Sequence, residues 1–355
     1  MSGKPKVYVA GIGMITPVGA DAPMTAAFVR CGRGVQRESD YINNAGKSIT
    51  MAMVPDEALP EFAPELETSE DISVPIGRML LMASLALQDA MAGYRGNRPT
   101  PLILAGPAAY ANQEIPFTHA FFDHLITQTQ IQIDRPNCRL INAGRTGVHA
   151  AIALATKYLN QGLGDYILVG GVDSYQDYDL LLQLDEQGRI KAEDTPDSFV
   201  PGEAAAFLLL THKAELAKPF GRYKLSISEP GVADEPGHLY STETYTGSGL
   251  ADAIRLAIQN GNGQAIRTVY SSMNGEHFWA KEYGVAMIRN KEAMDENVKH
   301  EHPAECFGDL GAAAGAVLIG IAGLAMAKEG TPHTSLIYCS SDQAQRAAIC
   351  VSLEM

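Results

Sequence analysis

The sequence predicts an α/β fold in which buried sheets alternate with layers of helices. Short apolar runs of strand length alternate with longer segments whose apolar residues recur at helical spacing. The strand runs are almost uniformly apolar, as in sheets that are covered on both faces. Each half of the chain also contains one helical segment of small apolar residues, Thr146–Tyr158 and Gly311–Ala327. This pairing suggests an internal duplication with the two helices sandwiched between sheets.

The first half is predicted to begin with a strand at Val7–Ala10, which Gly11-Ile12-Gly13 ends in a turn. A short helix, an exposed acidic loop and a longer helix follow at Met24–Cys31, Glu57–Asp71 and Arg78–Ala92. The remaining elements alternate between strand and helix until a final pair of strands: Pro101–Ala105, Phe117–Thr127, Leu140–Ala143, Thr146–Tyr158, Asp165–Val169 before Gly170-Gly171, and Ala204–Leu210.

The second half repeats this plan. Its predicted elements are a strand, a helix, a strand, a long helix and two closing strands: Tyr223–Ser228, Gly249–Gln259, Thr268–Ser271, Gly311–Ala327, Ser335–Tyr338 and Ala347–Leu353. The uncharged segment Leu310–Ala327 has the length of a membrane span. Because it is mostly Gly and Ala, which transfer poorly into lipid and pack closely, we predict a buried central helix. We place the two halves at residues 1–215 and 216–355 of one integrated domain.

Composition limits the possible partners. The chain has 355 residues, of which 46% are hydrophobic, so it is long enough to bury a large core. A net charge of −14 argues against nucleic acid and anionic membranes as partners. No signal peptide is visible before the first strand, so we expect a cytoplasmic protein. The five cysteines form no CxxC pair and predict buried thiols in a reducing compartment: Cys31, Cys138, Cys306, Cys339 and Cys350.

Five stretches, in chain order, resemble landmarks of the β-ketoacyl synthases, which belong to the thiolase-fold superfamily. They are the opening strand Val9–Gly19, the nucleophile elbow Ala143–Ala150, the next strand Asp165–Asp173, the glycine–glutamate turn Phe199–Ala206 and the second-histidine segment Gly308–Val317. The resemblance implies a five-layered αβαβα thiolase fold with two duplicated halves. It also implies a dimer paired through the strand before the elbow, Cys138–Asn142. The nearby charges of Arg135 and Arg139 leave homodimer and heterodimer both open.

The same resemblance implies that the family's catalytic triad is lost. A nucleophile on the strand-to-helix turn would project toward the positive end of the helix, but Gly144 stands where the family has its cysteine. The two histidines fall on Asn274 and Asp309, and the supporting lysine falls on Ala304. The loop that gates the acyl pocket is replaced by Ser340–Arg346.

These replacements predict that neither condensation nor decarboxylation takes place, so no catalytic residue is assigned. Gly144 tolerates a strained elbow but forms no thioester. Asn274 donates a hydrogen bond but cannot shuttle a proton near neutral pH, and an ionised Asp309 repels an enolate. Arg145 projects a fixed cation at the cleft; it either binds a carboxylate or phosphate or pairs with Asp309, and we favour the internal pair.

Two further residues of the remnant cleft could supply a relocated active site. His277, near Glu276 and Glu282, is a candidate base, and Cys306 is a candidate replacement nucleophile. We favour a rim histidine and an inert core cysteine instead. No cofactor is predicted, because Gly11-Ile12-Gly13 lacks the third glycine of a dinucleotide site. No metal site is predicted either, because His119, Asp123, His124 and Glu114 lack metal-ligand spacing. Of the other histidines, His149 is expected to pack under the elbow, and His300-Glu301-His302 is expected in a solvated loop.

Three functions remain in consideration. The first is a non-catalytic adaptor or chaperone that binds another protein, such as a secreted type VI effector; stand-alone thiolase-like proteins of bacteria suggest it by analogy. The second is a chain-length-factor-like partner of an active ketosynthase, which the loss of the gating loop opposes. The third is a divergent acyl-thioester transferase of the 3-oxoacyl-carrier-protein synthase type. The net charge opposes docking of an acidic carrier protein, unless Arg30, Arg33 and Arg37 form a basic patch.

Overall fold

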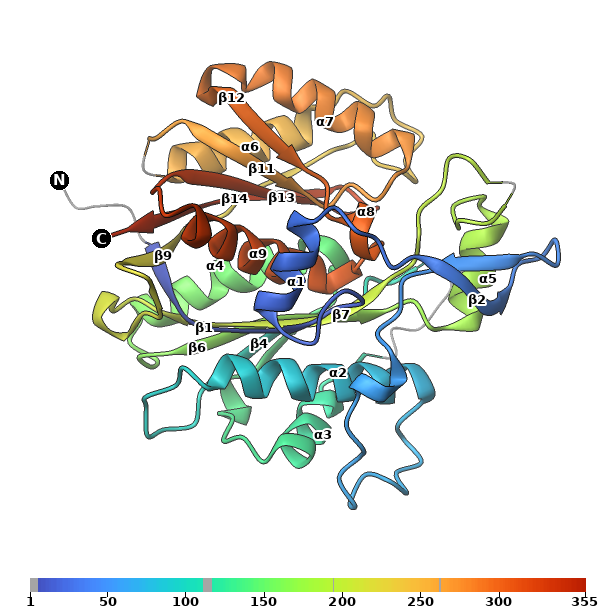
Figure 1. The fold of residues 1–355 in the computed structure, drawn as a ribbon, viewed down its shortest axis with the longest axis horizontal. Helices are drawn as coiled ribbons and strands as arrows, with labels where there is room; N and C mark the ends of the chain where they lie inside the picture. The colour runs from blue at the N-terminus through green and yellow to red at the C-terminus, as the bar shows by residue number, and fades with distance from the viewer. Residues whose placement is uncertain (1–5, 111–116, 194, 262) are drawn as a thin grey trace.

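The computed structural model describes residues 6–110, 117–193, 195–261 and 263–355. It confirms the predicted α/β architecture, with five layers in the order αβαβα (Figure 1). Helices form the two outer layers and the middle layer, and sheets lie between them. From one side to the other the helices are α2 (Val74–Met91) and α3 (Ala120–Thr129), then α4 (Gly147–Asn160) and α9 (Ala314–Glu329), then α6 (Ser248–Asn260) and α7 (His277–Arg289).

The strands of the two halves are arranged in the same order. In the first half it is β1 (Lys6–Ile15), β7 (Glu203–Thr211), β6 (Ile167–Ser174), β4 (Leu102–Ala105) and β5 (Arg139–Ile141). In the second it is β9 (Tyr223–Ser228), β14 (Gln345–Glu354), β13 (Thr334–Ser340), β11 (Ile266–Ser271) and β12 (Met294–Glu301). In each half the last three strands are parallel and the first two pair antiparallel. This shared pattern is the duplication that the sequence predicts.

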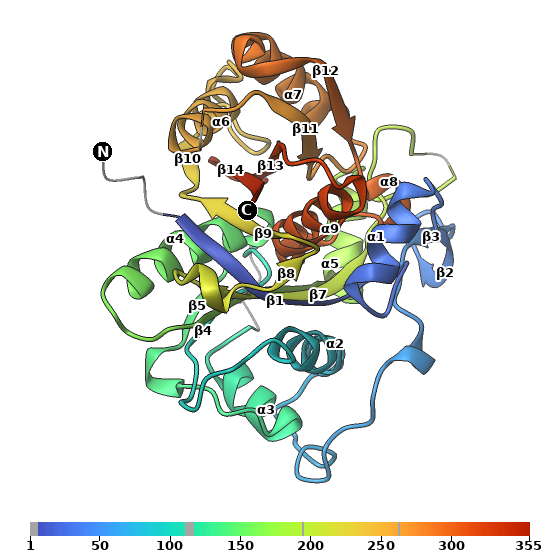
Figure 2. The same cartoon turned by 60° about the vertical axis from the view of Figure 1, so that its left-hand side comes forward.

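The two sheets are joined through one strand. β1 pairs with β9 at Tyr8 and Ser226, and β9 also pairs with β14, so these ten strands form one continuous path. Figure 2 shows β9 at the junction, with the sheet folded over α4 and α9. The smaller elements are α1 (Ala22–Arg30), β2 (Arg37–Ile42), β3 (Ser48–Met51), α5 (Tyr178–Glu186), β8 (Pro219–Phe220), β10 (Gly231–Asp234) and α8 (Ala304–Phe307).

The predicted central helix is present as α9. The apolar helical stretch Gly311–Glu329 would be long enough to cross a membrane, but 78% of its most apolar window is buried inside the protein. Small residues let the layers close around it: a Cβ on Gly320 would lie 2.4 Å from Met14 of β1, and one on Gly315 would lie 2.9 Å from Val148 of α4. The small-residue composition therefore serves close packing within the core.

The predicted turn at Gly11-Ile12-Gly13 is wrong, because both glycines lie inside β1. A Cβ on either glycine would lie 2.0 Å from a backbone carbonyl oxygen of α2, that of Ala90 for Gly11 and of Ala86 for Gly13. Gly170 and Gly171 likewise lie inside β6. Gly11 and Gly13 bring α2 close to the sheet, and Gly170 leaves room for the Phe207 ring of β7. Sequence alone does not separate these packing roles from a turn.

Two further expectations need correction. His300 and Glu301 lie in β12, and His302 follows it with its Nδ1 2.7 Å from Ser271 Oγ, so this segment is not a solvated loop. Its charged residues occupy the edge of the sheet. Cys31 is exposed after α1, whereas the other four cysteines are buried, and all five are free thiols. The prediction of buried thiols therefore holds for four of the five.

Candidate functional site

The elbow between β5 and α4 keeps its backbone shape without a reactive side chain. Gly144 has a φ of +52°, a left-handed conformation that favours glycine. Its N–H donates to the carbonyl oxygen of Gly106 at 3.2 Å. A Cβ at this position would lie 3.1 Å from that of Ala108. The turn is therefore built for glycine, and the atom that would carry an acyl group is absent.

Arg145, the next residue, points into the cleft and is 5% exposed. Its Nη1 lies 2.5 Å from Asp309 Oδ2, its Nη2 donates to Asp342, and its Nε donates to the carbonyl oxygen of Ser340 at 2.8 Å. The guanidinium carbon also lies 4.9 Å from the ring centre of Trp279. The internal pair with Asp309 that we favoured from the sequence is present. Because all three nitrogens have protein partners, the cation is not free for a ligand.

Asp309 lies at the centre of the polar contacts beside Arg145. Asn274 donates from Nδ2 to the same Asp309 oxygen at 2.8 Å, and to Glu276 at 3.1 Å. The other Asp309 oxygen accepts the N–H of Gly311 at 2.9 Å. Asn274 and Asp309 thus lie together, and Arg145, the neighbour of Gly144, pairs with the same Asp309 carboxylate. The two side chains are therefore occupied by each other and by Arg145.

A second arginine, which sequence reasoning missed, completes the cluster. Arg189 contacts Glu276 through two nitrogens, at 2.7 and 2.8 Å, and Asp342 at 2.8 Å. Asp342 therefore lies between Arg145 and Arg189. Although burial alone raises the pKa of a carboxyl, these two cations hold the pKa of Asp342 at about 2. For Arg145, burial acts to lower the pKa, but the nearby Asp309 and Asp342 carboxylates outweigh it and raise the pKa well above its usual value, so the guanidinium stays charged.

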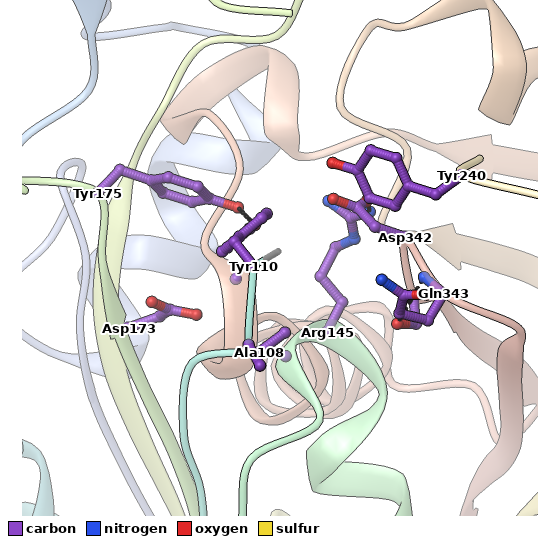
Figure 3. Close-up of a pocket in the computed structure, with 12 residues that line it drawn as sticks. Ala108, Tyr110, Arg145, Asp173, Tyr175, Tyr240, Asp342 and Gln343 are labelled. Carbon is purple, nitrogen blue, oxygen red and sulfur yellow. Dashed lines mark hydrogen bonds and ion pairs between the residues drawn. The ribbon is translucent and has the colours of Figure 1, made fainter. Parts of the chain in front are cut away.

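Little open space remains beside this cluster. The cavity at the elbow has a volume of about 20 Å³, room for about one water molecule. Figure 3 shows Asp173, Tyr175 and Tyr110 on one side of it and Arg145 and Asp342 on the other. Burial raises the pKa of Asp173 to about 7, and its carboxylate accepts the N–H of Ala312 at 2.8 Å. No acyl chain fits in such a cavity.

The other two residues predicted for the remnant cleft do not line this cavity. The His277 side chain is 82% exposed at the start of α7, and its Nδ1 lies 3.3 Å from Asp197. Cys306 is 5% exposed in the core, where burial raises the pKa of its thiol. Glu282, near His277 in sequence, instead pairs with the buried Arg346 at 2.6 Å. The structure therefore brings only Arg145 of the three to the elbow.

None of the buried thiols is activated. Burial raises the pKa of Cys138 and Cys306, and raises that of Cys339 and Cys350 to about 12. A nucleophilic cysteine needs the opposite, a lowered pKa beside a cation or a helix N-terminus. These four positions are consequently poor acceptors of an acyl group.

The described residues include no group of three or more His, Cys, Asp or Glu placed to hold a metal ion. Of the residues weighed from the sequence, His124 lies 3.3 Å from Asp71 and the His119 ring packs against Phe122. Glu114 lies outside the described residues.

The buried His149, under the elbow, should make the protein less stable in mild acid. The side chain is 0% exposed, and burial lowers its pKa from 6.5 to about 4. Below pH 6.5 the unfolded chain takes up a proton that the native protein binds only near pH 4. We expect this difference to lower the free energy of unfolding by about 3 kcal/mol between pH 6.5 and 4.

Urea unfolding at several pH values measures this effect. The His149→Leu variant should lose this part of the pH dependence, whereas His277→Gln, which changes an exposed histidine, should keep it. An unchanged slope in His149→Leu would exclude the buried imidazole as the cause.

No protein-family model and no curated protein matches this sequence. Solved structures do match over nearly the whole chain. A ketosynthase from module 6 of the bacillaene synthase of Bacillus subtilis superposes with a TM-score of 0.77 at 15% identity, over 99% of this chain and 72% of that one. This chain has the ketosynthase fold.

Complexes of ketosynthases with chain length factors have the same fold. ApeO with its chain length factor ApeC from Xenorhabdus doucetiae gives a TM-score of 0.76 at 15% identity, over 99% of this chain and 98% of that one. The ishigamide ketosynthase/chain length factor gives 0.70 at 16% identity, over 98% and 99%. At these identities the likeness establishes the thiolase-type fold, and function has to be argued from the site.

Proposed function

We propose that this chain is a non-catalytic protein with the ketosynthase fold, which works by binding another protein. The single observation that carries this proposal is the Arg145–Asp309–Asn274 cluster. Acyl transfer needs a nucleophile and free hydrogen-bond donors aimed at the developing oxyanion. At this elbow the nucleophile is missing, and the donors are bound to buried carboxylates.

The edge of the first sheet supports a protein partner. β5 is the last strand in the order, so its outer edge has no strand partner among residues 6–110, 117–193, 195–261 and 263–355. Leu140 and Ile141 on this strand are half-buried, and Arg139 is exposed. An unpaired edge presents backbone donors and acceptors to another chain. We place the partner on β5.

Two kinds of partner follow from this proposal. The first is an unrelated client protein that the chain holds as a cytoplasmic adaptor or chaperone, with a secreted type VI effector as the class suggested by analogy. The second is an active ketosynthase, with this chain in a role like that of a chain length factor. The structural likeness to ApeO–ApeC and to the ishigamide ketosynthase/chain length factor supports this second candidate.

Affinity purification of the tagged chain from its source cells, with mass spectrometry of the bound proteins, separates these candidates. An adaptor should retain one unrelated protein in stoichiometric amount, and a chain-length-factor-like subunit should retain a ketosynthase. Arg139→Glu on β5 should weaken retention, whereas Arg95→Glu, which changes an exposed arginine beyond α2, should not. A chain that is recovered alone, or binding that is equal in both variants, would contradict the proposal.

A further inference from the structure

A second opening lies away from the elbow. It is a groove of about 620 Å³ between α1 and α9 on one side and the β11–β12 edge of the second sheet on the other. In Figure 1, α1 lies against α9 while β12 forms the end of the sheet. The helices do not cover the whole face of these two strands. The volume is in the range of small-molecule sites, about 300–1,000 Å³.

The helix side of the groove is apolar except at the C-terminal ends of α1 and α9, where Arg30, Lys328 and Glu329 lie. α1 contributes Ala26 and Val29, and α9 contributes Ile321 and Ala325, which are four residues apart and so share one face of the helix. On the strand side, Thr268 pairs with Lys299 and Tyr270 pairs with Glu301 across β11 and β12. Residues two apart on a strand face the same way, so these four side chains form one polar wall.

Tyr270 supplies an unpartnered hydroxyl at this wall. The residue is 7% exposed and lines the groove. Its hydroxyl makes no hydrogen bond within the described part of the chain, yet its oxygen is not among the atoms sealed from solvent. The hydroxyl therefore opens into the groove, where a ligand can use it as a donor.

Two of the three cations at the rim have no acid partner within the described part of the chain. Arg30 and Lys328 line the groove, and neither forms an ion pair with a described residue. Lys299 lies 3.6 Å from Glu329, which also lies 3.9 Å from His333. With Glu301, the lining holds three cations and two carboxylates. This excess of positive charge stands out in a chain whose net charge is −14.

We propose that this groove binds a small amphipathic anion. Its apolar body would lie on the helix side, and its carboxylate or phosphate would accept from Arg30, Lys328 and the Tyr270 hydroxyl. The site is separate from the elbow and does not depend on the protein partner proposed above. Its ligand is defined by this shared chemistry, an anionic head on a short apolar chain.

Calorimetric titration with octanoate and octyl phosphate, each below its micellar concentration, tests the site. We expect saturable 1:1 binding of at least one of them, and the tighter one identifies the head group. Octanol, which lacks the charge, and acetate, which lacks the apolar chain, should bind at least about tenfold more weakly. Equal binding of octanol would overturn the proposal, as would no saturable binding of either anion.

Substitutions of residues that line the groove test whether the anion binds there. Arg30→Gln and Tyr270→Phe should each weaken the binding about tenfold. Arg95→Gln, which changes an exposed arginine outside the groove, should leave it unchanged. Thermal unfolding of each variant confirms that it is folded before titration. Wild-type affinity in both groove variants would overturn the assignment.

Discussion

Replacing Arg145 with methionine should lower the free energy of unfolding by about 3–5 kcal/mol, the usual cost of removing one partner from a buried ion pair. Arg145 is 5% exposed, and its loss leaves the Asp309 carboxylate with Asn274 and the Gly311 N–H as its remaining partners among the described residues. Asp342 keeps Arg189, so the penalty arises mainly at Asp309. Chemical denaturation at pH 7 measures the change.

A matched control and a second substitution make this prediction specific. Arg255→Met removes an arginine whose side chain is 57% exposed and paired with Asp252, and it should cost less than about 1 kcal/mol. Adding Asp309→Asn to Arg145→Met should recover part of the loss, because it removes the charge left unpaired. A cost below about 1 kcal/mol for Arg145→Met itself would show that the cluster does not hold the elbow together.

Glu282→Gln should lower the free energy of unfolding by about 3 kcal/mol or more. Glu282 Oε1 lies 2.6 Å from Nε of Arg346, and the two side chains are 1% and 0% exposed. Gln has the same shape but no charge, and an arginine cannot lose its proton to adapt. Arg346 Nη1 also donates to the carbonyl oxygens of Ser341 and Gln343, so we expect the turn between β13 and β14 to loosen too.

The matched control for Glu282→Gln is Asp252→Asn, the same loss of charge in an exposed pair, which should cost less than about 1 kcal/mol. Chemical denaturation at pH 8 measures the free energy of unfolding of both variants. Hydrogen exchange at residues 341–345 reports the turn separately. An equal cost in the two variants would mean that burial does not strengthen the Glu282–Arg346 pair.

Much of the fold could be predicted because its main signals are local. The uncharged run at Gly311–Ala327 fixes the central helix, and the apolar strand runs fix both sheets. Helix α7 was not predicted, because Trp279, Glu282 and Ala286 are its only buried residues and give little apolar pattern. β12 was missed because its half-exposed edge position tolerates a charged sequence.

The site could be predicted only where the resemblance fixed a position. Gly144, Asn274 and Asp309 were assigned in this way. Asn274 is hydrogen-bonded to Asp309, and Arg145, the neighbour of Gly144, pairs with the same carboxylate. Arg189 and Trp279 could not be assigned to the site, because the sequence does not show which arginine or aromatic side chains are buried beside it. Arg189 finds its partner Glu276 at 87 residues' distance along the chain. Such long-range ion pairs depend on tertiary packing, which no local motif encodes.

Intact-protein mass spectrometry after incubation with acetyl-CoA and a malonyl-loaded carrier protein tests the proposed lack of acyl transfer most directly. We predict an unchanged mass and no release of carbon dioxide, because the elbow has no nucleophile and its polar groups bind one another. A stoichiometric acyl adduct on any of the five cysteines, or decarboxylation above the rate without protein, would contradict the proposal that this protein is non-catalytic.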